Sequence, residues 1–188
     1  MTPEALSPQQ PEVFAPRLTQ LLDFFEMVLS ERMGGIPVVN PCLCVEPVGF
    51  EHSDSLATEL ADMTEPTDDL LASYNGSILE GILITPWFMS LVRLPVTTMA
   101  GQRYTGKRYL RQFGGEAFDF LGNYDATVGY FESCALFSPM AGFDNQNLAR
   151  ETARHVLEQL RQEVRSRPPT SSRRLFLTGR RPNSGARS

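Results

Sequence analysis

Apolar residues recur at helical spacing in two stretches, one towards each end of the chain. In residues 16–33 and 145–164, leucine, phenylalanine and valine repeat along one side, and charged residues fall on the other. Pro16 suits a first helical turn, and Gly34-Gly35 offers a left-handed stop after the first helix. Pro168-Pro169 ends the second. The pattern therefore predicts an N-terminal and a C-terminal amphipathic helix.

Between these helices the pattern changes to short apolar runs that proline and glycine interrupt. The predicted strands cover residues 43–51, 82–84, 88–94, 118–121 and 129–139, with an extended, turn-rich piece at 102–112. Pro47 lies inside the first of them, which places that strand at a sheet edge or at a bulge. Strands without helical crossovers favour an α+β fold. We expect a mainly antiparallel sheet of about five or six strands, with both helices packed on one face.

The longest apolar run, residues 81–95, contains the only tryptophan of the chain, Trp87. Pro86 cannot donate a hydrogen bond to a sheet, so it divides the run into two strands that meet at a bend. The bend carries Trp87, Phe88 and Met89. Such side chains suit a partner-binding surface, whereas an apolar run is more often buried core. The sequence leaves both interpretations of Trp87 open.

The length of 188 residues and an apolar content of 41% fit a single domain with tails. We expect a disordered leader at 1–14, one domain at 15–165 that contains an acidic mobile loop at 53–76, and an arginine-rich tail at 166–188. The net charge is −5, and the six arginines of the tail leave −11 on the rest of the chain. An acidic body argues against nucleic acid. No apolar run reaches the length of a membrane span, so we expect no stable membrane insertion.

Motifs for catalysis are absent from the sequence. It lacks a phosphate-binding glycine loop, a GxSxG motif and an HExxH motif. We therefore predict no catalytic residue, no metal site and no cofactor, although a small-molecule enzyme on an α+β scaffold stays a rival class. Cys42, Cys44 and Cys134 are few and irregularly spaced for a closed zinc site. One interpretation is that these cysteines are simply buried free thiols. The alternative is a metal-delivery or redox accessory protein that uses all three thiols.

Several sequence blocks follow one another in an order that we associate with one family. The blocks are residues 33–37, 40–41, 45–50, 81–91, 114–120, 130–140 and 172–179. The Thr-Pro-Trp-Phe block at 85–88 and the Ala-Leu-Phe-Ser-Pro block at 135–139 are the most specific. On these blocks the chain resembles the HybE/HupJ-type assembly chaperones of [NiFe] hydrogenases, over most of residues 15–180. The acidic segment 53–75 matches least.

The resemblance implies a non-enzymatic, cytoplasmic maturation factor for a membrane-bound uptake hydrogenase. Its partners would be the large subunit, the small subunit with its signal peptide, or other hydrogenase assembly proteins. Such a factor would hold the hydrogenase subunits back from export until the metallocentres are inserted. The bend and the matching blocks at 45–50 and 130–140 together give the expected partner-binding residues. These are Glu46, Phe50, Pro86, Trp87, Phe88, Met89, Phe137, Ser138 and Pro139.

The tail contains a second motif, Ser172-Arg173-Arg174-Leu175-Phe176-Leu177, which resembles the twin-arginine export consensus. It stands near the C-terminus with no apolar segment after it, so it cannot act as an export signal. A basic tail that docks on its own body is the simpler interpretation. The more specific hypothesis is that Arg173, Arg174, Phe176 and Leu177 mimic the signal of the client and occupy the groove of the protein when no client is bound.

Overall fold

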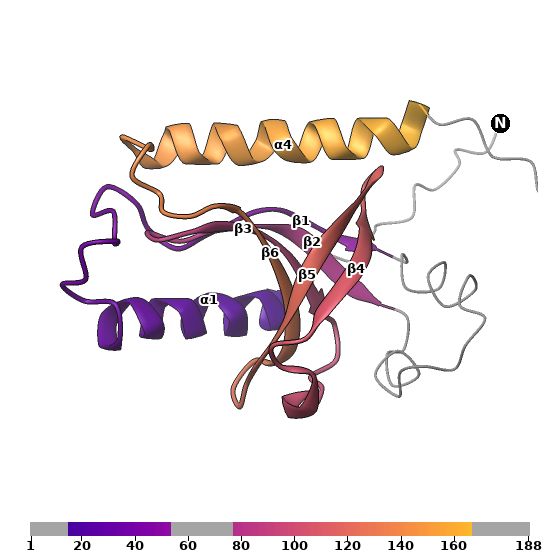
Figure 1. Ribbon diagram of the computed structural model, residues 1–188, viewed down its shortest axis with the longest axis horizontal. Coiled ribbons are helices and arrows are strands. Elements are labelled where there is room, and N and C mark those ends of the chain that lie inside the picture. The colour runs from indigo at the N-terminus through magenta and orange to yellow at the C-terminus, as the bar shows by residue number, and fades with distance from the viewer. Residues whose placement is uncertain (1–14, 54–76, 167–188) are drawn as a thin grey trace, which may run out of the picture.

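The computed structural model describes residues 15–53 and 77–166. It shows a sheet between two long helices (Figure 1). The elements are α1 (Ala15–Glu31), β1 (Glu46–Ser53), β2 (Ile78–Ile84), β3 (Met89–Pro95), the short 3₁₀ helix η1 (Gln102–Tyr104), β4 (Arg108–Phe113), β5 (Glu116–Asp125), β6 (Gly129–Phe137) and α4 (Gln146–Ser166). The expected leader, acidic loop and arginine tail fall almost wholly outside these residues, and the tail motif does so entirely.

The described strands form one antiparallel sheet of six in the order β1-β2-β3-β6-β5-β4. Two three-stranded meanders, β1 to β3 and β4 to β6, are joined where β3 pairs with β6. The α+β class and the antiparallel sheet are thus confirmed. β1 is an edge strand with an irregular register between Val48 and Glu51. The prediction from Pro47, that its strand lies at a sheet edge or at a bulge, is therefore also confirmed. The turn-rich piece expected at 102–112 contains η1 and most of the second edge strand, β4.

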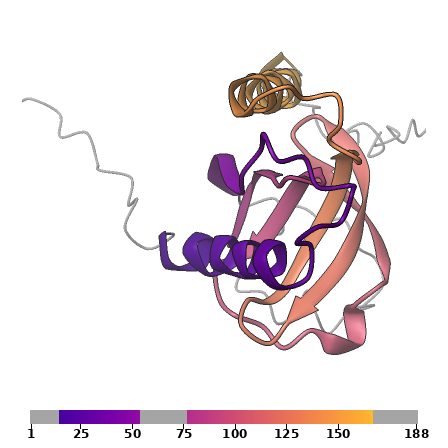
Figure 2. The ribbon, with the colours of Figure 1, turned by 90° about the vertical axis from the view of Figure 1, so that its left-hand side faces the viewer.

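The expected placement of both helices on one face is wrong, because they cover opposite faces of the sheet. Alternate residues of a strand point to opposite faces. On β2, Leu83 packs in a cluster with Leu21 of α1, whereas Ile82 packs in a cluster with Leu157 of α4. Every residue of β2 and β3 is buried, as expected for strands covered on both sides. Figure 2 shows α4 end-on above the curved sheet and α1 on its other side.

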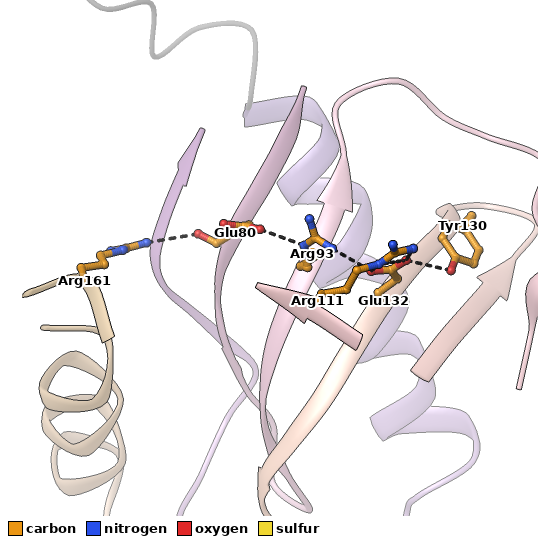
Figure 3. Close-up of polar contacts among 6 residues, drawn as sticks. All are labelled: Glu80, Arg93, Arg111, Tyr130, Glu132 and Arg161. Carbon is orange, nitrogen blue, oxygen red and sulfur yellow. Dashed lines mark hydrogen bonds and ion pairs between the residues drawn. The ribbon is translucent and has the colours of Figure 1, made fainter. Parts of the chain in front are cut away.

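A network of buried charges crosses the α4 side of the sheet (Figure 3). Arg93 on β3 donates to Glu80 on β2 at 2.8 Å and to Glu132 on β6 at 3.2 Å. Arg111 on β4 reaches the same Glu132 at 2.9 Å, and the hydroxyl of Tyr130 donates to it at 3.1 Å. All four charged residues are less than 8% exposed. The cross-strand register aligns opposite charges, which compensates for their removal from water.

Glycine on the intervening strand leaves space beside this network. Gly122 of β5 pairs with Glu132 of β6, between that strand and β4. A Cβ atom at Gly122 would lie 2.4 Å from the carbonyl oxygen of Tyr104 and 3.0 Å from the Tyr130 hydroxyl. A side chain at this position would therefore displace the groups that pack around Glu132.

Helix α4 is fixed to the sheet near both of its ends. Towards its start, Arg150 pairs with Glu46 of β1. Towards its end, Arg161 donates to the carbonyl oxygen of Gly49 at 2.7 Å. It also donates to that of Glu80 at 3.3 Å (Figure 3). The β4–β5 turn donates from Gly115 to the carbonyl oxygen of Leu160 at 2.9 Å. Neither helix in the described ranges has the length and apolar character needed to cross a membrane.

Candidate functional site

Three loops that are distant in sequence meet at one end of the molecule. They are residues 36–44 after α1, the β2–β3 turn at 85–88, and residues 137–143, which run from the last residue of β6 towards α4, and we call them together the tip (left end in Figure 1). The amide of Asn40 donates to the carbonyl oxygen of Pro86 at 2.8 Å, which joins the first loop to the second. The hydroxyl of Ser138 lies 3.5 Å from the carbonyl oxygen of Trp87, which brings the third loop to the second.

The β2–β3 connection is a tight turn whose residues explain its shape. The amide of Thr85 donates to the carbonyl oxygen of Phe88 at 2.8 Å, and the amide of Phe88 donates to the Thr85 hydroxyl at 3.0 Å. Pro86 and Trp87 occupy the two central positions, and proline favours the first of these because its φ is fixed. The Thr-Pro-Trp-Phe block is therefore a rigid hairpin turn, in agreement with the predicted bend.

Trp87 is half-buried, and its ring rests on aromatic side chains of the α1 side. Its ring centroid lies 6.4 Å from that of Phe25 on α1 and 5.6 Å from that of Phe88. Phe88 contacts Phe25 as well, at 5.5 Å. Trp87 thus belongs to the margin of the core and also presents surface to solvent. An aromatic side chain held in this way is a pre-organised contact, since few rotamers remain for a partner to restrict.

The other expected site residues separate into an exposed and a buried group. Phe137 is 39% exposed, and its ring contacts Phe143 at 5.3 Å. Ser138 and Pro139 beside it are exposed, whereas Pro86 is buried. Met89 is 0% exposed and lies in the core beneath the tip, so the expectation that it contacts a partner does not fit its burial.

Phe50 also lies away from the tip, because β1 carries it along the sheet edge. It packs on the α1 side of the sheet over Gly81, where a Cβ atom would come within 2.5 Å of its ring. Glu46 is at the tip end of β1, since it pairs with Ile84 next to the turn. Its carboxylate accepts from Arg150 at 2.5 and 3.0 Å and from Gln146 at 2.5 Å. Burial raises the pKa of Glu46, but these hydrogen bonds outweigh burial and hold the pKa below its ordinary value.

The structure adds residues to the tip that the sequence pattern did not single out. Ile36 is 41% exposed and Val38 is 39% exposed, both in the loop after α1. Asn40 in the same loop connects all three segments of the tip. Periodicity cannot reveal such residues, because they lie outside helices and strands. The only signal was their place within or beside the sequence blocks at 33–37 and 40–41.

The three cysteines do not form a common site. Cys42 and Cys44 are exposed in the first loop of the tip, whereas Cys134 lies on β6 against the α4-side core. Burial raises the pKa of both the Cys44 and the Cys134 thiol, which disfavours the thiolate that binds metal. Within residues 15–53 and 77–166, no three histidine, cysteine, aspartate or glutamate side chains converge as metal ligands do. The geometry therefore gives no support to metal delivery by the three thiols.

A surface hollow of about 300 Å³ lies between β1 and α4, away from the tip. Its lining includes Gly49, Glu51, Leu157 and Arg161, and the Glu51–Arg161 ion pair at 3.1 Å lies along it. It is at the small end of the range for ligand pockets, and it contains none of the expected site residues. The tip, where most of those residues gather, is the better candidate.

A rigid α+β scaffold that presents partly exposed aromatic side chains on short loops is an arrangement typical of small protein-binding modules. Comparison with known sequences gives the particular family. Residues 16–179 match the family model described as "[NiFe]-hydrogenase assembly, chaperone, HybE", and the chain belongs to this family.

Two relatives of known name agree with this assignment by sequence. Protein HoxT of Cupriavidus necator is 39% identical over 176 residues, which cover 88% of this chain and 89% of that protein. The hydrogenase expression/formation protein HupJ of Bradyrhizobium diazoefficiens is 33% identical over 161 residues, or 80% and 81% of the two chains. The solution structure of HybE from Escherichia coli aligns with a TM-score of 0.44 at 18% identity, covering 97% of this chain and 95% of that one.

Proposed function

We propose that this protein is a chaperone that binds a [NiFe]-hydrogenase subunit through the tip during assembly of the enzyme. The family supplies the hydrogenase as the client, and the tip supplies a surface for contact. The observation that carries the proposal is the half-buried Trp87 on a rigid turn, with Phe137, Ile36 and Val38 exposed in the same three loops. Exposed apolar side chains that gather at one place mark interaction sites.

The client bound at the tip is, in this proposal, a subunit that has not yet been exported. A chaperone of this kind acts in the cytoplasm and holds the large subunit, or the small-subunit precursor with its twin-arginine signal peptide, until the metallocentres are in place. It acts by binding and not by catalysis. The exposed side chains of the tip fit the apolar surface of an incompletely assembled subunit, because desolvation of aromatic anchors is a main source of affinity between proteins.

The experiment measures the affinity of the full-length chain for purified hydrogenase subunits. The large subunit, the small-subunit precursor and the small subunit without its signal peptide are titrated separately. We expect at least one of them to bind, and Phe137→Ala to weaken that binding. If Phe137→Ala weakens binding of the precursor but does not weaken binding of the small subunit without its signal peptide, the signal peptide is the element recognised.

A matched control separates the tip from exposed apolar surface in general. Leu121 on β5 is 40% exposed, almost the same as Phe137 at 39%, but lies outside the three loops of the tip. Leu121→Ala should leave client affinity unchanged. If wild-type protein binds none of the three proteins, the proposed function is wrong. If Phe137→Ala and Leu121→Ala weaken binding equally, the tip is not the site.

A further inference from the structure

Asn40 is the point where the three loops of the tip are tied together. Its backbone amide donates to the carbonyl oxygen of Pro86 at 2.8 Å in the hairpin turn. Its side-chain nitrogen Nδ2 donates to the carbonyl oxygens of Met140 at 3.0 Å and Phe143 at 2.8 Å in the third loop. Its side-chain oxygen Oδ1 accepts from the amide of Cys42 at 2.9 Å in its own loop. Every polar group of the side chain is therefore used.

The chemistry of this position requires an amide side chain. Two carbonyl oxygens face Nδ2 and one amide faces Oδ1, so the residue must donate twice and accept once within a short reach. Aspartate has the same size but, when ionised, only accepts, and it would place a negative oxygen against the two carbonyl groups. Alanine would leave all three backbone groups without this partner. Asparagine satisfies the site because its side chain carries both a donor and an acceptor.

These bonds hold the first loop, which carries Ile36 and Val38, against the turn and against the third loop. Phe137 itself is placed by its pairing with Met89 and by the contact of its ring with Phe143. Pro86 stands next to Trp87 in the turn, and the third loop, which carries Phe137, includes the Met140 and Phe143 carbonyl groups that Asn40 binds. Ile36 and Val38 belong to the loop of Asn40 itself. Short loops on a rigid scaffold bind well only when their contact groups are held in place before the partner arrives.

We infer that Asn40 is a positioning residue for the tip: it contacts no client, and it holds the first and third loops against the turn of Trp87 in the arrangement that binds one. The inference rests on the proposed function of the tip for its binding part. The part that concerns the shape of the tip can be measured without any client, because Trp87 is the only tryptophan of the chain. Its fluorescence emission therefore reports the surroundings of this one turn, including its packing on Phe25.

The experiment compares Asn40→Asp and Asn40→Ala with a matched control, Asn123→Asp. Asn123 on β5 also donates twice from Nδ2, to the Leu121 carbonyl oxygen at 2.8 Å and the Ser133 hydroxyl at 3.0 Å, and it lies outside the tip. Both Asn40 variants should shift Trp87 emission to longer wavelength and lower client affinity by about tenfold or more. The control should lose stability to a similar degree and keep both readouts. Because Asn40→Ala removes the same hydrogen bonds without adding a carboxylate, its comparison with Asn40→Asp separates loss of the bonds from the effect of the new negative charge.

Each outcome decides a separate question. Unchanged emission and affinity in both Asn40 variants would overturn the inference. Changed emission with unchanged affinity would also overturn it, since the shape of the tip would then not matter for binding. If both variants fail to fold while the control folds, Asn40 supports the whole domain and the inference is wrong. If the wild type binds no hydrogenase subunit, the proposed function fails, and the emission of the variants still tests whether Asn40 shapes the tip.

Discussion

The tip and the buried charge network reverse the usual placement of side chains. At the tip, apolar residues such as Phe137 and Ile36 are about 40% exposed, while on the α4 side of the sheet Glu132 and Arg93 are each 2% exposed. Both regions combine residues that are far apart in sequence. The network is held by cross-strand pairing between β2, β3 and β6, and the tip by hydrogen bonds between loops.

The difference shows which physical term each region depends on. Buried charges are tolerated only when each has a partner, so the network contributes to a unique strand register and is sensitive to loss of any member. Exposed apolar residues contribute little to stability, because water still surrounds much of their surface. Changes in the network should therefore fall on folding, and changes at the tip on client binding.

The largest effect should come from Glu132→Gln. The substitution keeps the size of the side chain but removes the carboxylate that Arg93 and Arg111 share at 3.2 and 2.9 Å. Breaking a buried ion pair from one side typically lowers the free energy of unfolding by about 3–5 kcal/mol. Urea denaturation measures this loss. The folded fraction should keep its affinity for the client, and a loss below about 1 kcal/mol, the size expected for an exposed pair, would contradict the prediction.

Trp87→Ala should have the next largest effect, and it should act mainly on binding. An interface anchor typically loses about 2 kcal/mol or more of binding free energy when truncated. Because Trp87 also rests on Phe25, stability should fall, but by less than the roughly 3–5 kcal/mol of a fully buried aromatic residue. Titration with the hydrogenase subunit and denaturation of the same sample give the two values. Trp87→Phe, which keeps an aromatic ring in place, serves as the control. A full core-sized loss of stability with unchanged affinity would make Trp87 a core residue.

Much of the fold follows from local pattern, because helices and turns are set by neighbouring residues. The two helices, the bend at Pro86-Trp87 and the edge or bulge position of Pro47 were all predicted from spacing and proline chemistry. The placement of the helices was not. The apolar run at 82–84 indicated a buried strand, but only the three-dimensional packing shows that Leu83 and Ile82 meet different helices. A strand apolar on both faces requires cover on both faces, and that inference was available from the sequence.

The site was predictable only where a sequence block coincided with exposed surface. Trp87 and Phe137 lie in such blocks and stand at the tip, whereas Met89 lies in the same block and is buried. Sequence order cannot separate these cases, because exposure depends on where the strand begins: Met89 is the first residue of β3 and faces the α4-side core, whereas Trp87 stands in the turn before it. The pairing of Arg93 with Glu132 could not be predicted either. Contacts between strands distant in sequence are set by register, and no single-strand pattern contains it.

A smaller effect is expected from pH at the Glu46–Arg150 pair. Because the pKa of Glu46 is lowered in the folded state, its contribution to stability is present above the pKa of the unfolded chain, about 4.3 for glutamate, and is lost as the pH falls through the folded value. The pair is partly exposed, so Glu46→Gln should lower the free energy of unfolding by no more than about 1 kcal/mol at pH 7. Denaturation of both proteins from pH 7 down to acid should show the difference disappearing. A difference that persists in acid would assign it to packing instead of charge.

The smallest effect should come from Leu110→Gln, and it tests whether the tip is the only exposed apolar surface that binds. Leu110 on β4 is 71% exposed, on the half of the sheet opposite the edge that β1 forms. Loss of so exposed a side chain should change the free energy of unfolding by no more than about 0.5 kcal/mol. Client affinity, measured as for Trp87→Ala, should also stay unchanged. A clear loss of affinity would show that the docking surface extends over β4 and β5. Exposed apolar residues would then bind the client on both halves of the molecule and not at the tip alone. The sheet would still differ from the tip in its buried charges, but no longer in the absence of a binding surface.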